Sequence, residues 1–154
     1  MGKYLKKNVT GSRYFGNTIT VTDPCYDRDV WCRIDGLEIR EGDYDCIYWT
    51  KSKDNRVMCC GIYLNGFVPP KDSFEEIGTI GVDAGLAGFF ENKPDYNDDE
   101  WLELVHNFYD TEDKNSMISD CGFFTSTGYG DGCYGVGVYT SPASGKVEAV
   151  EIWF

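Results

Sequence analysis

Most of the chain alternates apolar and polar residues in short runs that turn residues separate, which is the pattern of half-buried β-strands. The first clear run, NTITVTD, is rich in β-branched residues and ends at Asp23-Pro24, a dipeptide that favours a turn. Asp54-Asn55 stands between two further runs and predicts a tight hairpin. The predicted strands cover residues 17–23, 37–40, 44–51, 56–64, 77–83, 87–91, 122–127, 134–140 and 146–154.

One segment has helical spacing instead. Four apolar residues recur at i, i+3, i+4 and i+7, and so share one face of a helix: Trp101, Leu104, Val105 and Phe108. Asp98 precedes them as a suitable N-cap, so the sequence predicts a helix over residues 99–109. The polar residues 110–116 predict a loop.

Eight or nine strands and one helix predict an α+β fold. We expect it to be predominantly antiparallel β, a sandwich or an open barrel, with the amphipathic helix near residues 98–110. The chain has 154 residues, no internal repeat and no long linker, so we expect a single domain over residues 1–154. Residues 1–16 are expected to be a flexible lead-in or an edge strand.

Charge narrows the classes of partner. The chain has 26 acidic and 14 basic residues, a net charge of −12, and residues 72–120 alone hold 14 acids against two lysines. Without surplus cations to displace counterions from phosphates, direct nucleic-acid binding is not expected. The acidic segment is either a solvated face or a surface that docks on a basic protein with electrostatic steering. Its expected contacts are Asp98, Asp99, Glu100 and Glu103, with Tyr96 and Tyr129 as exposed aromatic anchors.

The sequence predicts a cytoplasmic protein with no membrane partner. Its basic N-terminus lacks the apolar stretch of a signal peptide, and no apolar run approaches the roughly 18 residues of a spanning helix. Seven cysteines without a CxxC pair indicate reduced thiols rather than a zinc site, and three of them, Cys46, Cys59 and Cys60, lie in strand-like runs where burial is expected.

A single histidine excludes a multi-histidine metal site. His106 with Cys25 or Cys133 is the only possible cysteine–histidine pair for nucleophilic catalysis. Because His106 stands beside the apolar stripe of an acidic helix, a surface or boundary position is the simpler interpretation.

Three aspartates are candidate catalytic or metal-binding residues: Asp23, Asp83 and Asp131. Each also has an ordinary structural explanation, as an Asx-turn at Asp23, a strand-end cap at Asp83 and a hairpin turn at Asp131-Gly132. If the three converge, they can bind a hard divalent cation or act as an acid–base pair. No other cofactor is expected.

The glycine-rich segment GYGDGCY is the most unusual local sequence. It forms a turn, or it lets backbone N–H groups approach a small ligand. It is not a P-loop, since no Lys-Ser/Thr follows and no helix begins there. The candidate ligand-binding residues are Gly128, Tyr129, Gly130, Asp131 and Tyr134.

Four motifs occur in a particular order: Asp23-Pro24, Gly42-Asp43-Tyr44, Val82–Gly85 and Gly128–Tyr134. With the closing strand over residues 146–154, this order resembles a bacterial domain family of unknown function, over about residues 17–154. The cysteines near Asp-Pro-Cys-Tyr and Trp31-Cys32 resemble a subset found in gut Firmicutes and their mobile elements. The resemblance implies one complete domain and no particular activity. The positions it marks for testing are Asp23, Asp83, Gly130, Asp131 and Tyr134.

Three hypotheses about function follow. The first is a non-enzymatic cytosolic binding module, in its most concrete form an acidic accessory or phage-borne inhibitor that docks on a basic protein surface, or a module that binds a small ligand. The alternative is a hydrolase that uses Asp83 and Asp131 as an acid–base pair or as metal ligands. A third is a redox-responsive protein that uses the turn cysteines Cys25, Cys32 and Cys133.

Overall fold

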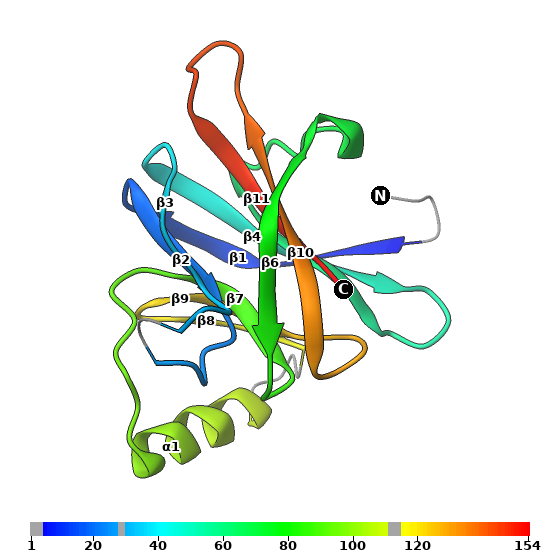
Figure 1. Ribbon diagram of the computed structural model, residues 1–154. Helices are drawn as coiled ribbons and strands as arrows, with labels where there is room; N and C mark the ends of the chain where they lie inside the picture. Colours follow the sequence, from blue (N-terminus) through cyan, green and yellow to red (C-terminus); the bar gives the residue numbers. More distant parts are fainter. Residues whose placement is uncertain (1–4, 28–29, 111–114) are drawn as a thin grey trace.

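The computed structural model of the chain describes residues 5–27, 30–110 and 115–154. Within them, eleven strands form two antiparallel sheets, and one α-helix lies on the outer side of the smaller sheet (Figure 1). The elements are β1 (Leu5–Phe15), β2 (Thr18–Thr22), β3 (Ile34–Glu38), β4 (Gly42–Lys51), β5 (Val57–Leu64), a 3₁₀ turn (Lys71–Ser73), β6 (Glu75–Val82), β7 (Leu86–Phe90), α1 (Asp98–Tyr109), β8 (Ser116–Ser119), β9 (Gly122–Ser126), β10 (Gly132–Thr140) and β11 (Val147–Trp153).

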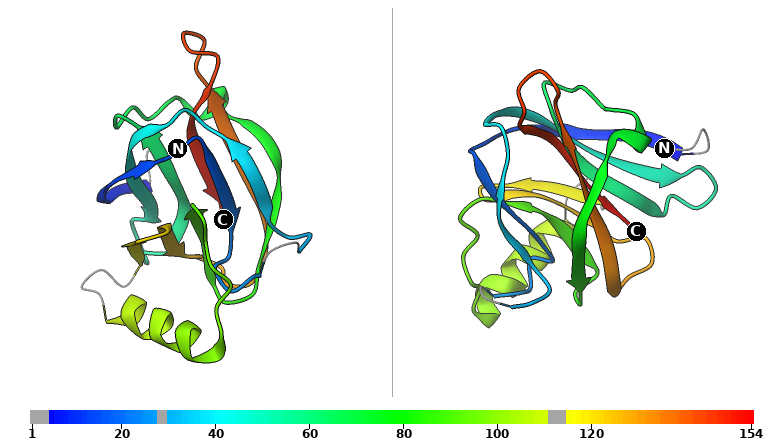
Figure 2. Two further views of the ribbon diagram at one scale, coloured as in Figure 1. Left: turned by 90° about the vertical axis from the view of Figure 1, so that its left-hand side faces the viewer. Right: turned by 45° about the horizontal axis from the view of Figure 1, so that its top comes forward.

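The two sheets pack face to face and do not close into a barrel (Figure 2). The larger sheet has the strand order β1-β4-β5-β11-β10-β6, and the smaller has the order β3-β2-β7-β9-β8. The expected α+β, predominantly antiparallel fold is therefore confirmed, in its sandwich form.

The central strands of the larger sheet are buried on both faces, as β4 shows. Tyr44, Cys46 and Tyr48 point into the core between the sheets, whereas Ile47 and Trp49 belong to a second apolar cluster on the outer face. Successive side chains of a strand point to opposite faces. A strand that is covered on both sides therefore reads as an apolar run rather than a clean alternation.

Helix α1 covers the outer face of the smaller sheet. Trp101, Leu104 and Phe108 pack on Phe90 and Phe124, and the rings of Phe108 and Phe124 stack with centroids 5.4 Å apart. This is the apolar stripe that the sequence predicts, apart from Val105, which is only partly buried and lies outside the cluster.

The N-cap of the helix differs from the prediction. Asn97, not Asp98, caps it: the Asn97 side chain accepts the N–H of Glu100 at 2.9 Å, and the Glu100 carboxylate accepts the N–H of Asn97 at 3.3 Å. This reciprocal pair is a capping box. Asp98 becomes the first helical residue, where its charge still favours the positive end of the helix dipole.

Of the two alternatives for residues 1–16, the edge strand is present as β1, whereas the sequence did not predict β8. β1 is an edge strand with mostly exposed or partly exposed side chains, so it lacks an apolar alternation. β8 has four residues, too few for a period to be recognised, and it occupies the end of the predicted 110–116 loop and the residues after it. Residues 111–114 of that loop lie outside the described part. β3 covers Ile34–Glu38 rather than residues 37–40, and a positive φ of 68° at Gly36 interrupts its alternation.

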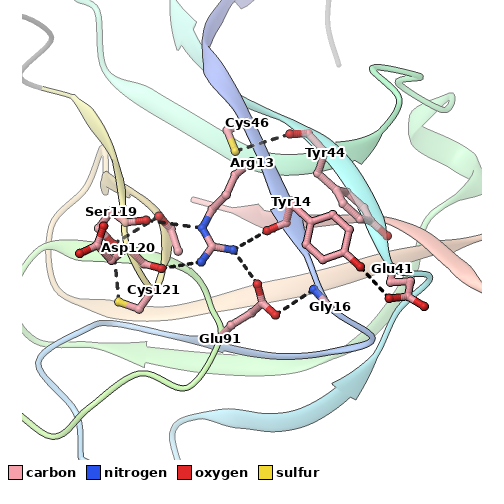
Figure 3. A network of polar contacts seen from close by, with 11 residues as sticks. Arg13, Tyr14, Gly16, Glu41, Tyr44, Cys46, Glu91, Ser119, Asp120 and Cys121 are labelled. Atoms are coloured by element: carbon pink, nitrogen blue, oxygen red, sulfur yellow. Dashed lines mark hydrogen bonds and ion pairs between the residues drawn. The ribbon is translucent and has the colours of Figure 1, made fainter.

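A partly buried arginine, Arg13, links edge strand β1 to the smaller sheet (Figure 3). Arg13 forms an ion pair with Glu91 at 2.6 Å and donates to the carbonyl oxygens of Ser119 and Asp120 in the β8–β9 turn. The second oxygen of Glu91 accepts the N–H of Gly16 at 2.8 Å. These contacts connect β1 of the larger sheet to the end of β7 and the β8–β9 turn of the smaller sheet. The network therefore has a structural role, holding the two sheets together.

Candidate functional site

Helix α1 presents an acidic and partly apolar face to solvent. Leu102 and Tyr109 are 55% and 56% exposed, and their i, i+7 spacing places them on one side of the helix. All four acids that the sequence proposes as partner contacts are exposed: Asp98, Asp99, Glu100 and Glu103. We call Leu102, Tyr109 and these four acids the α1 outer face.

The helix dipole explains only part of this acidity. Asp98, Asp99 and Glu100 lie in the first turn, where negative charge stabilises a helix. Glu103 lies beyond that turn, and Asp110 is the C-cap, at the end where negative charge is unfavourable. The acidity at the far end therefore needs a reason other than helix stability.

Asp23 is a fully buried anchor between the sheets. Its Oδ1 accepts the N–H of Cys25 at 2.8 Å, and its Oδ2 accepts the N–H groups of Asp83 and Ala84 at 2.9 and 2.7 Å. These bonds tie the end of β2 to the end of β6. Burial raises the pKa of Asp23, and the three backbone donors partly offset this shift. The predicted Asx-turn is present, and it is joined by a long-range contact that local sequence does not reveal.

The other two candidate aspartates lie on neighbouring connections between the sheets. Val82, at the end of β6, pairs with Gly132, at the start of β10. Asp83 follows Val82 and Asp131 precedes Gly132, so both aspartates adjoin the same end of this two-strand ladder. Both are exposed. Asp83 thus follows the strand rather than lying in it, and Asp131-Gly132 is not a hairpin turn, because β9 and β10 belong to different sheets. No group of three metal-ligand side chains forms among the described residues.

The glycine-rich loop packs against the protein's own β4–β5 hairpin. Tyr129 accepts a hydrogen bond from Lys51 at 2.9 Å, and the Arg56 guanidinium lies 4.7 Å from its ring centre. The hydroxyls of Thr127 and Tyr134 both donate to the Gly130 carbonyl, at 2.6 and 2.8 Å. These contacts account for the predicted ligand-binding residues Tyr129, Gly130 and Tyr134 as parts of a folded turn.

Gly128→Ala is expected to lower the free energy of unfolding by about 1–2 kcal/mol, because the new methyl group falls inside contact distance of the Val57 carbonyl oxygen. Urea unfolding measures the change. The matched control is Gly130→Asn: Gly130 has a φ of 76° and open space around it, and asparagine tolerates that conformation. Equal losses in the two variants would contradict the close packing of Gly128 on the hairpin.

The position of His106 agrees with the simpler interpretation, a surface residue, rather than with a cysteine–histidine pair. His106 is exposed on the last turn of α1, and no described hydrogen bond joins it to Cys25 or Cys133. Burial and the neighbouring Asp23 carboxylate raise the pKa of Cys25, which disfavours the reactive thiolate. The predicted burial of the strand cysteines is confirmed, because Cys46, Cys59 and Cys60 all lie in the core.

Tyr96 is not the exposed anchor that the sequence proposes. Its hydroxyl contacts the Cys121 sulfur at 3.7 Å, and its ring packs on Trp101 with centroids 6.1 Å apart. Half-buried between the sheet and the helix, it belongs to the packing under α1.

Sequence reasoning passed over two buried cations, Arg33 and Lys93. They are 9% and 5% exposed and line a cavity of about 440 Å³ on the outer side of the smaller sheet. A signal was available for one of them, because Lys93 is one of only two lysines among the 14 acids of residues 72–120.

Comparisons with known proteins give no family and no function for this chain. No protein-family model, curated protein or solved structure matches the chain. No helix within the described residues has the length and apolarity to cross a membrane.

Proposed function

We propose that the chain is a non-enzymatic binding module of the cytoplasm that docks on a basic protein surface through the α1 outer face. The observation that carries the proposal is the exposed pair Leu102 and Tyr109 on a helix that also carries exposed carboxylates. A helix that only covers a sheet keeps its apolar residues on the covered side. Here two apolar residues, Leu102 and Tyr109, are exposed on the outer side, and a partner that covers them must also satisfy the acids beside them.

The two kinds of side chain have separate tasks in this proposal. Tyrosine and leucine supply the apolar contact that sets how long a complex lasts, and tyrosine is among the residues enriched at binding hot spots. The carboxylates attract a lysine- or arginine-rich surface from a distance and set the rate of association, which salt weakens. An accessory or inhibitor protein that occupies a basic surface of its target has this combination.

Neutralising the four acids of the α1 outer face is expected to weaken partner capture several-fold and to remove most of its salt dependence. The variant carries Asp98→Asn, Asp99→Asn, Glu100→Gln and Glu103→Gln. Glutamine at 100 retains the capping box, so the helix should persist. The measurement is capture by the immobilised full chain from extracts of the producing cell, at low and high ionic strength.

A matched variant neutralises four exposed acids on other elements, so that both variants lose the same charge: Glu38→Gln, Asp43→Asn, Asp72→Asn and Glu75→Gln. It should capture the partner as the natural chain does. A third variant, Leu102→Ser with Tyr109→Ser, should speed dissociation while keeping the salt dependence. Equal capture by the two neutralised variants would refute docking through α1.

A further inference from the structure

The two buried cations named above converge on one backbone oxygen. The Tyr26 carbonyl accepts Arg33 Nη1 at 3.0 Å and Lys93 Nζ at 3.1 Å. The two charged groups therefore lie no farther apart than the sum of these distances. Two like charges this close repel each other, and burial strengthens the repulsion by lowering the effective dielectric constant.

Electrostatics at Lys93 reflect this proximity. Burial and then the charge of Arg33 lower the pKa of Lys93, whereas the Asp95 and Asp27 carboxylates, each with a smaller effect than Arg33, raise it. No carboxylate within the described residues forms an ion pair with Lys93; its ammonium donates to the Tyr26 and Pro94 carbonyls. Among the described residues, Arg33 therefore has an ion pair, with Asp35, whereas Lys93 has none.

Arg33 also has an unsatisfied donor. Its side chain is 3% exposed; Nη1 donates to the Tyr26 carbonyl and Nη2 to Asp35, but the buried Nε–H has no partner among the described residues. A buried polar group without a partner is destabilising, so such groups are rare in folded proteins unless a water, ion or ligand pairs with them.

The cavity beside these cations has the composition of a small polar ligand site. β2 contributes Thr18 and Thr20, β3 contributes Asp35, and Asn92 follows β7. Asn92 has a φ of 49°, a conformation that places a non-glycine residue in a sparsely populated region. At about 440 Å³ the cavity falls within the range of small-molecule sites.

We propose that this cavity binds a small molecule through a carboxylate or phosphate group, which Arg33 and Lys93 hold between them. One oxygen accepts the Arg33 Nε–H, and the negative charge offsets the repulsion between the two cations. Thr18 and Asn92 at the rim provide polar contacts for the rest of the ligand. Asp35 already accepts hydrogen bonds from Arg33 and Thr20, and its negative charge would repel that of the ligand.

The test follows the Arg33 Nε–H signal by NMR while the full chain is titrated with phosphate or, separately, with acetate at constant ionic strength. A saturable shift is expected in at least one titration, and the anion that produces it identifies the headgroup. Lys93→Met should weaken this binding about tenfold, whereas Lys53→Met, which removes an exposed cation elsewhere, should leave it unchanged.

Asp35→Asn separates binding from structural effects. It keeps an acceptor for Arg33 but removes the opposing charge, so binding should become several-fold tighter, a gain that a loss of folding does not produce. A shift that grows linearly with anion concentration, or one that is the same in the natural chain, Lys93→Met and Asp35→Asn, would show only diffuse ion screening and overturn the proposal.

Discussion

Asp23→Ala is expected to lower the free energy of unfolding by about 3–5 kcal/mol, a large part of the total for a domain of this size. The buried carboxylate accepts three backbone N–H groups, two of them from a segment about 60 residues away in the chain. Alanine leaves all three donors without this acceptor at the point where β2 and β6 come together. The relief of a buried charge offsets part of this loss, because burial raises the pKa of Asp23.

Two further variants make this prediction specific. Asp23→Asn keeps one acceptor oxygen and should lose about half as much stability. Asp83→Ala removes an exposed carboxylate while its backbone N–H still binds Asp23, so it should change the free energy of unfolding by about 0.5 kcal/mol or less. Urea unfolding of the three variants measures this order. A loss at Asp83 as large as that at Asp23 would contradict the assignment of Asp23 as the anchor.

The same aspartates show which parts of this fold the sequence can predict. Strands such as β4 and β5, and the buried face of α1, follow from local periodicity, because each is long enough to display its period. The sequence also singles out Asp23 and the Asx-turn at Asp23-Pro24. It does not show that the Asp23 carboxylate reaches Asp83 and Ala84, since that contact depends on how the two sheets are joined.

The glycine-rich segment, residues 128–134, shows that local sequence can predict a turn but not which strands the turn connects. Its composition suits a hairpin turn equally well as a connection between sheets, and only the strand order distinguishes them. Likewise, nothing local predicts that Arg33 and Lys93 share the Tyr26 carbonyl, because the residues come from segments on opposite sides of β2 in the sheet. Local pattern therefore finds elements and turns, whereas long-range pairing decides which polar residues meet.

Glu151 and Glu148 lie on the same strand, β11, and are expected to affect the pH dependence of stability in opposite directions. Glu151 is 1% exposed and accepts the Tyr63 hydroxyl at 2.7 Å and the Trp153 indole N–H at 2.9 Å. Burial raises the pKa of Glu151 despite these bonds. A hydrogen bond from Ser144 and the Arg40 guanidinium lower the pKa of Glu148.

The direction of each pH effect on the free energy of unfolding depends on whether the folded or the unfolded state binds the proton more tightly. Above the ordinary glutamate pKa, unfolded Glu151 has lost its proton while folded Glu151 still holds one, so the free energy of unfolding falls as pH rises through this window. Folded Glu148 instead loses its proton at a lower pH than in the unfolded chain. Its contribution is present above the ordinary pKa and is lost as pH falls through the lowered one.

Glu151→Gln should therefore remove part of the loss of stability on raising the pH, and Glu148→Gln should remove part of the loss on lowering it. Glu151→Ala should cost about 2–4 kcal/mol at acidic pH, because it leaves the Tyr63 and Trp153 donors without their acceptor. The cost should shrink toward neutral pH, where the natural chain carries a buried charge. Urea unfolding across this pH range measures all three variants, with Asp23 intact in each. If Glu151→Gln and Glu148→Gln changed the pH profile in the same direction, burial of the Glu151 charge would not be the cause, and the hydrogen bonds to Tyr63 and Trp153 would have to outweigh it.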